Sequence, residues 1–200
     1  KDLKEKFNDQ ICAIIVEPIQ GEGGVNPITL PFLKEIKALC EKHNALLIYD
    51  EIQTGIGRTG KLFGYEHFLP VEPDVITLAK GLGAGLPIGC FMLKERLKDC
   101  LTPGEHASTF GGNLISTTAA KVVIEQIDKK RLLPKIERNG DYFKREIKKL
   151  KKEFKSIVDI RGMGYMIGME IDFPAREMIN NLITKNIIAI PAGDNIVRFL

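Results

Sequence analysis

Two residues of opposite charge follow short apolar segments of the sequence. Asp50 ends the segment ALLIYD (45–50), and Lys80 comes directly after DVITLA (74–79). Both segments are typical of buried strands. If the strands are neighbours in a parallel sheet, their carboxyl ends meet at one crevice, where α/β proteins bind ligands. Burial there disfavours the ammonium form of a lysine, so we expect the Lys80 amine to be a nucleophile toward aldehydes.

A lysine that forms a Schiff base and a carboxylate that keeps a ring nitrogen protonated are the two protein groups that pyridoxal 5'-phosphate (PLP) requires. Each residue alone has an ordinary explanation, because a strand-end aspartate commonly caps a turn and most lysines are surface charges. The pair, together with the motifs around it, favours a PLP site that involves Lys80 and Asp50.

Three glycine-rich segments offer other chemistry. GIGRTGK (Gly55–Lys61) matches the first seven positions of a phosphate-binding P-loop, but Leu62 stands where a Mg²⁺-binding Ser or Thr is needed. GLGAGLPIG (81–89) has Leu86 at the third glycine position of a dinucleotide loop and leads into another apolar run. GEGG (21–24) indicates only a sharp turn. A P-loop-like nucleotide site over Gly55–Lys61 remains the alternative.

The segments that position these residues alternate between strand and helix patterns. Strands are predicted at 12–17, 45–50, 74–79 and 88–93, and helices from 29 to about 44, at 94–100 and at 113–127. This alternation is typical of parallel α/β units. The sequence therefore predicts an α/β fold with Asp50 and Lys80 at one edge of a sheet of buried strands.

The sequence changes character near residue 131. Phe143, Ile147, Leu150 and Phe154 form one apolar stripe between many lysines, which favours an amphipathic helix with a solvated basic face over a nucleic-acid or membrane surface. Strands at 157–161, 165–171, 187–190 and 196–199 and a helix at 174–185 are expected to follow. We therefore predict a large-domain portion over 1–130 and a small α+β portion over 131–200.

Composition limits the partners. Basic residues exceed acidic ones by only 3, so nucleic acid is not expected. No apolar run reaches the length of about 18–20 residues that a membrane span needs, and the charged N-terminal segment has no signal-peptide pattern. The cysteines form no C-x-x-C pair, which indicates reduced thiols, no metal site and a cytoplasmic protein.

Four motifs together resemble the class III PLP-dependent aminotransferases in order and spacing. They are VEPIQGEGG (16–24), YDEIQTGIGRTG (49–60), LAKGLGAGLPIG (78–89) and GEHASTFGGN (104–113). The resemblance covers nearly the whole chain and is strongest to the acetylornithine and ornithine branch, with STFGGN and IVRFL favouring the former. It implies PLP-dependent transferase fold type I, with the second half of a large parallel-sheet domain and part of a small C-terminal domain.

The resemblance also implies a role for each matching residue. Lys80 forms the internal aldimine and moves the substrate proton, while Asp50 pairs with the ring nitrogen. Ile52 packs on the ring, provided that the segment after Asp50 stays extended, and Gln53 reaches its phenolic oxygen. Thr109 binds the cofactor phosphate in the neighbouring subunit of a homodimer, and three residues meet the substrate, namely Glu22, Ser108 and Arg198. Glu22 and Arg198 form an ion-pair gate; the alternative for Arg198 is an ordinary charge at a strand edge.

The implied activity transfers the ω-amino group of N-acetylornithine, or of an ornithine-like donor, to 2-oxoglutarate in arginine biosynthesis. PLP-dependent decarboxylation, racemisation or aminomutation are alternatives within the same chemistry. The chain starts without Met, stops in a strand-like segment and lacks the family's upstream phosphate turn, stacking aromatic residue and carboxylate-binding arginine. We therefore expect a piece of a longer enzyme, and a catalytically incompetent fragment is a further alternative.

Overall fold

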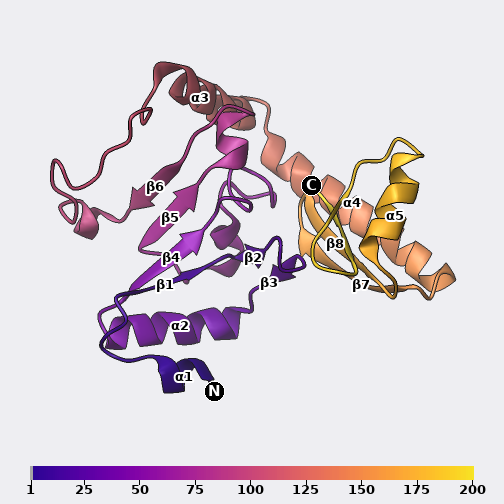
Figure 1. The fold of residues 1–200 in the computed structure, drawn as a ribbon, viewed down its shortest axis with the longest axis horizontal. Coiled ribbons are helices and arrows are strands. Elements are labelled where there is room, and N and C mark those ends of the chain that lie inside the picture. The colour runs from indigo at the N-terminus through magenta and orange to yellow at the C-terminus, as the bar shows by residue number, and fades with distance from the viewer. Residues whose placement is uncertain (1) are drawn as a thin grey trace.

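The computed structural model describes residues 2–200, which form two larger sheets, a small hairpin and the helices packed against them (Figure 1). The α-helices are α1 (Asp2–Lys6), α2 (Leu30–Lys42), α3 (Leu114–Lys129), α4 (Leu132–Glu153) and α5 (Ala175–Ile183), and the 3-10 helices are η1 (Gly64–Phe68), η2 (Lys80–Gly83) and η3 (Glu95–Leu97). The strands are β1 (Ala13–Val16), β2 (Ile19–Gln20), β3 (Asn26–Pro27), β4 (Leu46–Asp50), β5 (Val75–Leu78), β6 (Cys90–Leu93), β7 (Ile157–Met163), β8 (Met166–Ile171), β9 (Ile190–Pro191) and β10 (Ile196–Phe199).

The first sheet has the order β1-β4-β5-β6. Strands β1, β4 and β5 are parallel, as the sequence predicts, but β6 runs antiparallel to β5. The expectation that β6 is another buried strand was also wrong, since Phe91 and Met92 are exposed. The physical reason for the direction is the connection, because η2 and a few turns replace the crossover helix that parallel strands need. The parallel part of the sheet is therefore the part that ends at Asp50 and Lys80.

Helix α2 packs along this sheet and supplies much of its core (Figure 1). The helix begins after Thr29, and Pro31 occupies the first turn, where the absent N–H costs nothing. Leu33, Ile36 and Cys40 recur at helical spacing and are fully buried. These side chains pack with Leu47 and Tyr49 of β4, so that β4 is held firmly up to Asp50.

The second sheet is antiparallel, with the order β7-β8-β10-β9, and α4 and α5 cover it (Figure 1). Its core includes Ile147 of α4, Ile167 and Ile171 of β8, and Val197 of β10. The basic side of α4 is solvated, with Lys148, Lys149, Lys151 and Lys152 all exposed. The amphipathic interpretation is confirmed for the basic side and for Ile147, but Leu150 and Phe154 of the predicted apolar stripe are exposed at the end of the helix.

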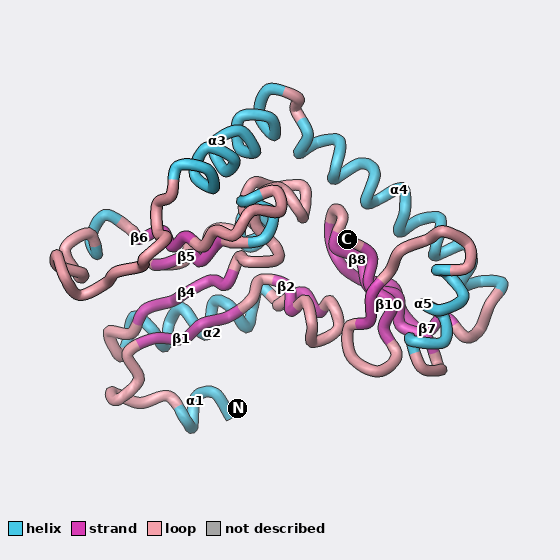
Figure 2. The backbone as a smooth tube through the Cα atoms, turned by 45° about the horizontal axis from the view of Figure 1, so that its top comes forward, coloured by secondary structure: helices cyan, strands magenta, loops and turns pink. Residues whose placement is uncertain are grey.

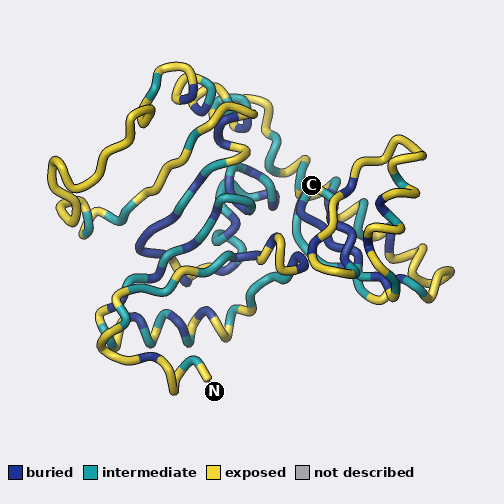
Figure 3. Tube along the Cα trace, in the orientation of Figure 1, coloured by how far each residue is buried: buried dark blue, intermediate teal, exposed yellow. Residues whose placement is uncertain are grey.

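Two predicted elements were wrong. Residues 94–100 contain only the single turn η3, and an exposed loop runs from there to Asn113, whose side chain accepts a hydrogen bond from Ser116 at the start of α3 (Figure 3). The strand expected at 187–190 is the short pair Ile190–Pro191. Its apolar run is not buried, since the exposed fraction of Ile188 is 88%. In both segments, apolar residues lie in exposed loops and do not pack into a hydrophobic core.

The two larger sheets lie on either side of the β2–β3 hairpin, below the joint between α3 and α4 (Figure 2). The Tyr165 amide donates a hydrogen bond to the Arg58 carbonyl at 2.9 Å, and Gly164 lies directly against Thr59. The chain crosses from one part to the other at Arg131, between α3 and α4. The division into portions 1–130 and 131–200 remains our proposal. Among residues 2–200, no helix has both the length and the apolar character to cross a bilayer.

Within the second part of the chain, Gly140 of α4 packs closely against the same residue, Gly164. A Cβ at this position of α4 would lie 2.1 Å from the Gly164 carbonyl oxygen. Glycine-to-alanine substitution in a helix normally stabilises it, but here we expect Gly140→Ala to lower the free energy of unfolding by about 1–3 kcal/mol through overpacking. Urea denaturation measures this change. Gly89→Ala is the control, because a Cβ there meets no atom within 4 Å; equal stability of the two variants would contradict the assigned contact.

Candidate active site

The carboxylate of Asp50 is fixed at the end of β4. In the parallel pairing of β4 with β5, Asp50 lies opposite Thr77. Its Oδ1 accepts hydrogen bonds from the Ile52 amide at 3.0 Å and from the Thr77 hydroxyl at 3.3 Å. Asp50 is half-buried. A carboxylate held by two donors at the end of a strand has a set orientation, with its second oxygen left for a further partner.

Lys80 lies on the next strand end. Strand β5 stops at Leu78, and Lys80 opens η2 with a φ of +40°, in the left-handed region. A residue other than glycine is rarely found there, and such strain, of about 1–3 kcal/mol, is concentrated at functional sites. The expectation that Lys80 is buried was wrong, because its side chain is exposed. The chain leaves the sheet before Lys80, so the strand core does not enclose its side chain.

Ile52 connects the two residues. Its amide binds Asp50, and it lines a hollow of about 280 Å³ together with Gln53 and Lys80. Asp50 itself lines a different cleft, of about 520 Å³, along β1. The prediction of an extended segment after Asp50 was wrong. The chain turns at once, because the aspartate caps the Ile52 amide. Ile52 thus links Asp50 to the hollow that Lys80 lines, and we propose that the three residues belong to one site.

Three other predicted residues form one polar cluster. Arg198 donates from Nη2 to Glu22 Oε1 at 2.7 Å and from Nη1 to Gln53 Oε1 at 3.0 Å, and Gln53 Nε2 donates to the same Glu22 oxygen at 3.1 Å. The hydrogen bond from Arg198 holds the pKa of Glu22 below its ordinary value. Residues far apart in the sequence therefore meet beside Lys80, since Gln53 lines the Lys80 hollow.

Arg198 is not an ordinary strand-edge charge. Strand β10 lies between β8 and β9, and the exposed fraction of Arg198 is only 3%. Its partner Glu22 is exposed, with 73% of the side chain accessible. The Nε atom of Arg198 is buried without a hydrogen-bond partner, an arrangement that is costly unless another group binds there. The buried guanidinium is suited to accept a carboxylate from a ligand when Glu22 moves away.

Glu51, next to Asp50, was not foreseen as a structural residue of the site. Its side chain is fully buried and accepts hydrogen bonds from the Thr54 hydroxyl and from the amides of Gly64 and Tyr65. These bonds close the loop that carries Ile52 and Gln53. Burial raises the pKa of Glu51, and the three hydrogen bonds oppose that rise. The available sequence signal for a buried Glu51 was the adjacent pair Asp50-Glu51 at the end of a buried strand, because neighbouring side chains point in different directions.

The buried Glu51 should leave a signature in the pH dependence of stability. A carboxyl group whose pKa rises on folding contributes stability below its unfolded value near 4.5 and loses it as pH rises through the folded value. We expect Glu51→Gln to remove this loss. The free energy of unfolding of the variant minus that of the wild type should therefore increase as pH rises. Urea denaturation between pH 4 and 8 measures the difference, with Glu66→Gln in the same loop as control. A difference independent of pH would contradict the assignment.

Ser108 and Thr109 lie apart from the other predicted residues. Both are exposed in the long loop between β6 and α3, which arches away from the sheet (Figures 1 and 3). No hydrogen bond joins either side chain to Asp50 or Lys80 within the described part of the chain. The prediction that Thr109 serves a neighbouring subunit is neither supported nor opposed by this placement.

The alternative nucleotide site does not form. Residues Gly55–Lys61 make a series of turns and lead into the short helix η1, whereas a P-loop leads into an α-helix whose N-terminus faces the phosphates. GLGAGLPIG leads into β6, which also excludes a dinucleotide loop. Within residues 2–200, no group of three or more His, Cys, Asp or Glu side chains is arranged to hold a metal ion.

The fold and this site define a fold type I PLP-dependent transferase, with a lysine and an aspartate at adjoining ends of a largely parallel sheet. The family of class III aminotransferases matches residues 1–200, and the chain belongs to that family.

Individual proteins of known identity resemble the chain over its length. An acetylornithine aminotransferase of Caldanaerobacter subterraneus is 43% identical, covering 99% of this chain and 50% of that protein. A succinylornithine transaminase of Photorhabdus laumondii is 41% identical, covering 98% and 50%. The crystal structure of the ornithine aminotransferase of Toxoplasma gondii, described with partial occupancy of PLP at its active site, has a TM-score of 0.91 at 36% identity, covering 98% and 47%. The chain thus spans about half the length of the curated relatives it matches.

Proposed function

We propose that the protein containing this chain is an aminotransferase that uses PLP. In this proposal the ω-amino group of N-acetylornithine, or of a similar ornithine derivative, is transferred to 2-oxoglutarate, a step of arginine biosynthesis. The observation that carries the proposal is the parallel pairing of β4 and β5, which puts the fixed carboxylate of Asp50 beside the strand that leads into Lys80. The names of the relatives, which act on acetylornithine, succinylornithine and ornithine, support the choice of donor.

The residues present fit this cofactor. PLP needs an amine and a carboxylate, and Lys80 and Asp50 offer these at neighbouring strand ends. Ile52 lines the hollow beside Lys80 and would supply apolar surface there, although the turn after Asp50 replaces the extended segment that its predicted role required. When bound, PLP supplies an electron sink for the negative charge that develops on the substrate carbon. Lys80 would hold the cofactor through its amine, and Asp50 would hold a proton on the ring nitrogen. Gln53 would bind a ring oxygen, and Thr109 of a second subunit would bind the phosphate.

The same lysine has a second task in the reaction. Once its amine is free, Lys80 would be the base that takes the proton from the substrate carbon and the acid that gives it back. The Lys80 side chain is exposed, so packing does not hold its amine in one place. Asp50, held by Ile52 and Thr77, keeps its charge in place through both half-reactions. Such fixed charges contribute because they need no reorganisation during the reaction.

Glu22 and Arg198 would select between the two substrates. While the ion pair is closed, Glu22 neutralises Arg198, and the pocket accepts the acylated ornithine. When Glu22 moves away, the buried guanidinium is free to bind a carboxylate of 2-oxoglutarate. The exposure of Glu22 and the burial of Arg198 support this division of roles. Ser108 would lie beside the substrate, and the homodimer and cytoplasmic location remain predictions.

A transamination assay of the complete protein tests the proposal. Wild-type protein with PLP, N-acetylornithine and 2-oxoglutarate is expected to form glutamate, and nitrogen-15 in the ω-amino group of the donor should appear in that product. N-succinylornithine and ornithine in parallel reactions rank the donors. Carbon dioxide, an inverted enantiomer or a shifted amino group, without glutamate, would instead indicate a decarboxylase, racemase or aminomutase. Glutamate formation absent with every donor would overturn the proposed function.

A further inference from the structure

The loop that carries Glu22 packs against the second sheet and is hydrogen-bonded to it. This loop, Gly21–Val25, joins β2 to β3. Val25, at its end, is fully buried among Met166, Ala192 and Ile196 and has a φ of +54°, a strained conformation for a β-branched residue. The surrounding packing therefore holds the tip of the loop in a conformation that the loop would not adopt alone.

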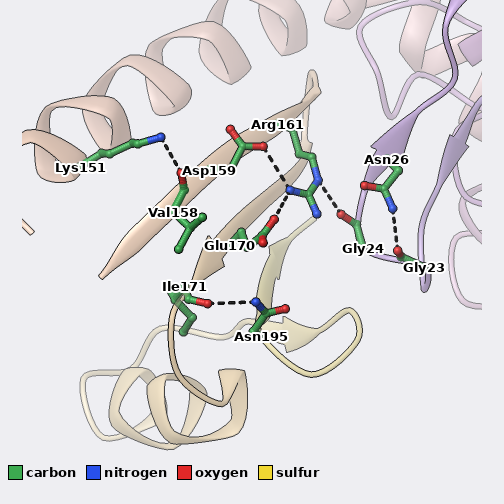
Figure 4. A network of polar contacts seen from close by, with 10 residues as sticks. All are labelled: Gly23, Gly24, Asn26, Lys151, Val158, Asp159, Arg161, Glu170, Ile171 and Asn195. Atoms are coloured by element: carbon green, nitrogen blue, oxygen red, sulfur yellow. Dashed lines mark hydrogen bonds and ion pairs between the residues drawn. The ribbon is translucent and has the colours of Figure 1, made fainter. Parts of the chain in front are cut away.

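Arg161 of β7 makes a second contact to the same loop (Figure 4). Its Nε donates to the Gly24 carbonyl at 2.9 Å, while its Nη1 donates to Asp159 Oδ2 at 3.1 Å and to Glu170 Oε2 at 2.6 Å. The two acids hold the guanidinium from the side of the second sheet. Arg161 therefore connects the loop to β7 and β8, and β8 is the strand next to β10, which carries Arg198.

This connection matters because the two residues of the Glu22–Arg198 pair differ in burial. The Arg198 guanidinium is buried in the second sheet, whereas the Glu22 carboxylate is largely exposed and is carried by the loop. The position of the loop therefore decides how often Glu22 lies against Arg198. Gly24, which Arg161 binds, is only two residues from Glu22.

We propose that Arg161 is a positioning residue that keeps Glu22 paired with Arg198 and thereby sets the balance between the two substrates of the reaction. The role in substrate choice rests on the proposed function, whereas control of the loop and of carboxylate binding does not. If the bond to Gly24 is lost, Glu22 pairs less often and the buried Arg198 is more often free. Affinity for dicarboxylates then rises, and affinity for the amino donor falls.

Arg161→Lys tests this role with little change of charge. A lysine still faces Asp159 and Glu170, but its ammonium lacks the planar fork that reaches both the acids and the Gly24 carbonyl. The matched control is Lys151→Met, which removes a cationic donor to the Val158 carbonyl of the same strand without touching the loop (Figure 4). Circular dichroism and thermal unfolding of both variants establish that they are folded.

Three measurements on the complete protein decide the outcome. The first is the Kd of glutarate, a dicarboxylate without a reactive carbonyl, measured by calorimetry; we expect it to fall about three- to tenfold in Arg161→Lys, the equivalent of one hydrogen bond. The second is hydrogen exchange of residues 21–25, expected to accelerate. The third is the ratio of KM values for 2-oxoglutarate and the donor, expected to fall. Lys151→Met should change none of these.

A double substitution separates positioning from general destabilisation. Glu22→Gln should also tighten glutarate binding, and Arg161→Lys added to it should produce no further change, because both act on the same pair. Additive effects, unchanged exchange in the loop, or no glutarate binding by the wild type would each overturn the inference. Failure of the proposed function is recognised separately, by the absence of transamination in the wild type, and leaves the glutarate and exchange measurements decisive.

Discussion

Substitution of Lys80 by alanine is expected to lower turnover of the complete enzyme by at least about 10²–10⁴-fold, the usual contribution of a positioned acid–base group. The loss falls on kcat because the same amine both holds the cofactor and moves the substrate proton. Alanine also leaves the neighbouring strand β5 and the Ile52–Gln53 segment untouched, since the Lys80 side chain is exposed and makes no hydrogen bond in the described structure. PLP is expected to bind the variant more weakly, and without a covalent bond.

Two readouts accompany this prediction. Borohydride treatment followed by peptide mapping should label Lys80 in the wild type and leave the variant unlabelled. Lys61→Ala is the matched control, because Lys61 ends the neighbouring glycine-rich loop and belonged to the rejected P-loop. Its turnover should remain within about twofold of the wild type. A labelled residue other than Lys80, or full activity in Lys80→Ala, would contradict the assignment of Lys80.

Local patterns were enough to predict the elements that support the site. The strands ending near Asp50 and Lys80 are short apolar runs between turn residues, and α2 has a clear start at Thr29 and Pro31 with buried positions at helical spacing. Such signals depend on neighbours in the sequence. The lysine-rich face of α4 was likewise correctly predicted as solvated, because its apolar stripe has one period throughout.

What the sequence could not predict depends on contacts between distant segments. The direction of β6 follows from the path of the chain through η2, not from the strand's own composition. The exposure of Lys80 follows from a turn that begins one residue before it. The bond from Arg161 to Gly24 joins residues 137 positions apart, and no local pattern marks either partner. The resemblance therefore names candidate site residues one by one, whereas the contacts that support them come only from the structure.

The two strand ends differ in how firmly they are held, and this difference matches their tasks. Asp50 is half-buried, paired in the sheet and bonded by two donors, whereas Lys80 is exposed on a strained turn outside the sheet. A group that provides a constant charge benefits from rigidity, because no reorganisation is then needed. A group that must leave one position and reach another benefits from freedom. Asp50 therefore depends on its charge, and the clearest test removes that charge alone.

Asp50→Asn should retain the structure and lose most of the activity. The asparagine carbonyl is still able to accept the hydrogen bonds from the Ile52 amide and the Thr77 hydroxyl, so β4 and the turn after it are preserved. A neutral amide, however, does not hold a proton on the ring nitrogen. We expect both half-reactions to slow by about 10²–10³-fold, the range observed when one fixed electrostatic group is removed. Single-turnover absorbance measurements, with donor alone and then with 2-oxoglutarate, follow each half-reaction.

Equal slowing of the two half-reactions distinguishes loss of charge from loss of substrate binding. A damaged donor or 2-oxoglutarate subsite would affect one half-reaction and raise one KM, whereas the Asp50 charge is needed in both. Asp172→Asn is the control, since Asp172 is an exposed acid directly after β8 in the second sheet, and its rates should equal those of the wild type. Thr77→Val removes one donor to Asp50 but keeps the charge, so its half-reaction rates should lie between those of Asp50→Asn and the wild type. Asp50→Asn rates within about threefold of the wild type would mean that another group protonates the ring, and that the pairing of β4 with β5 does not build the site.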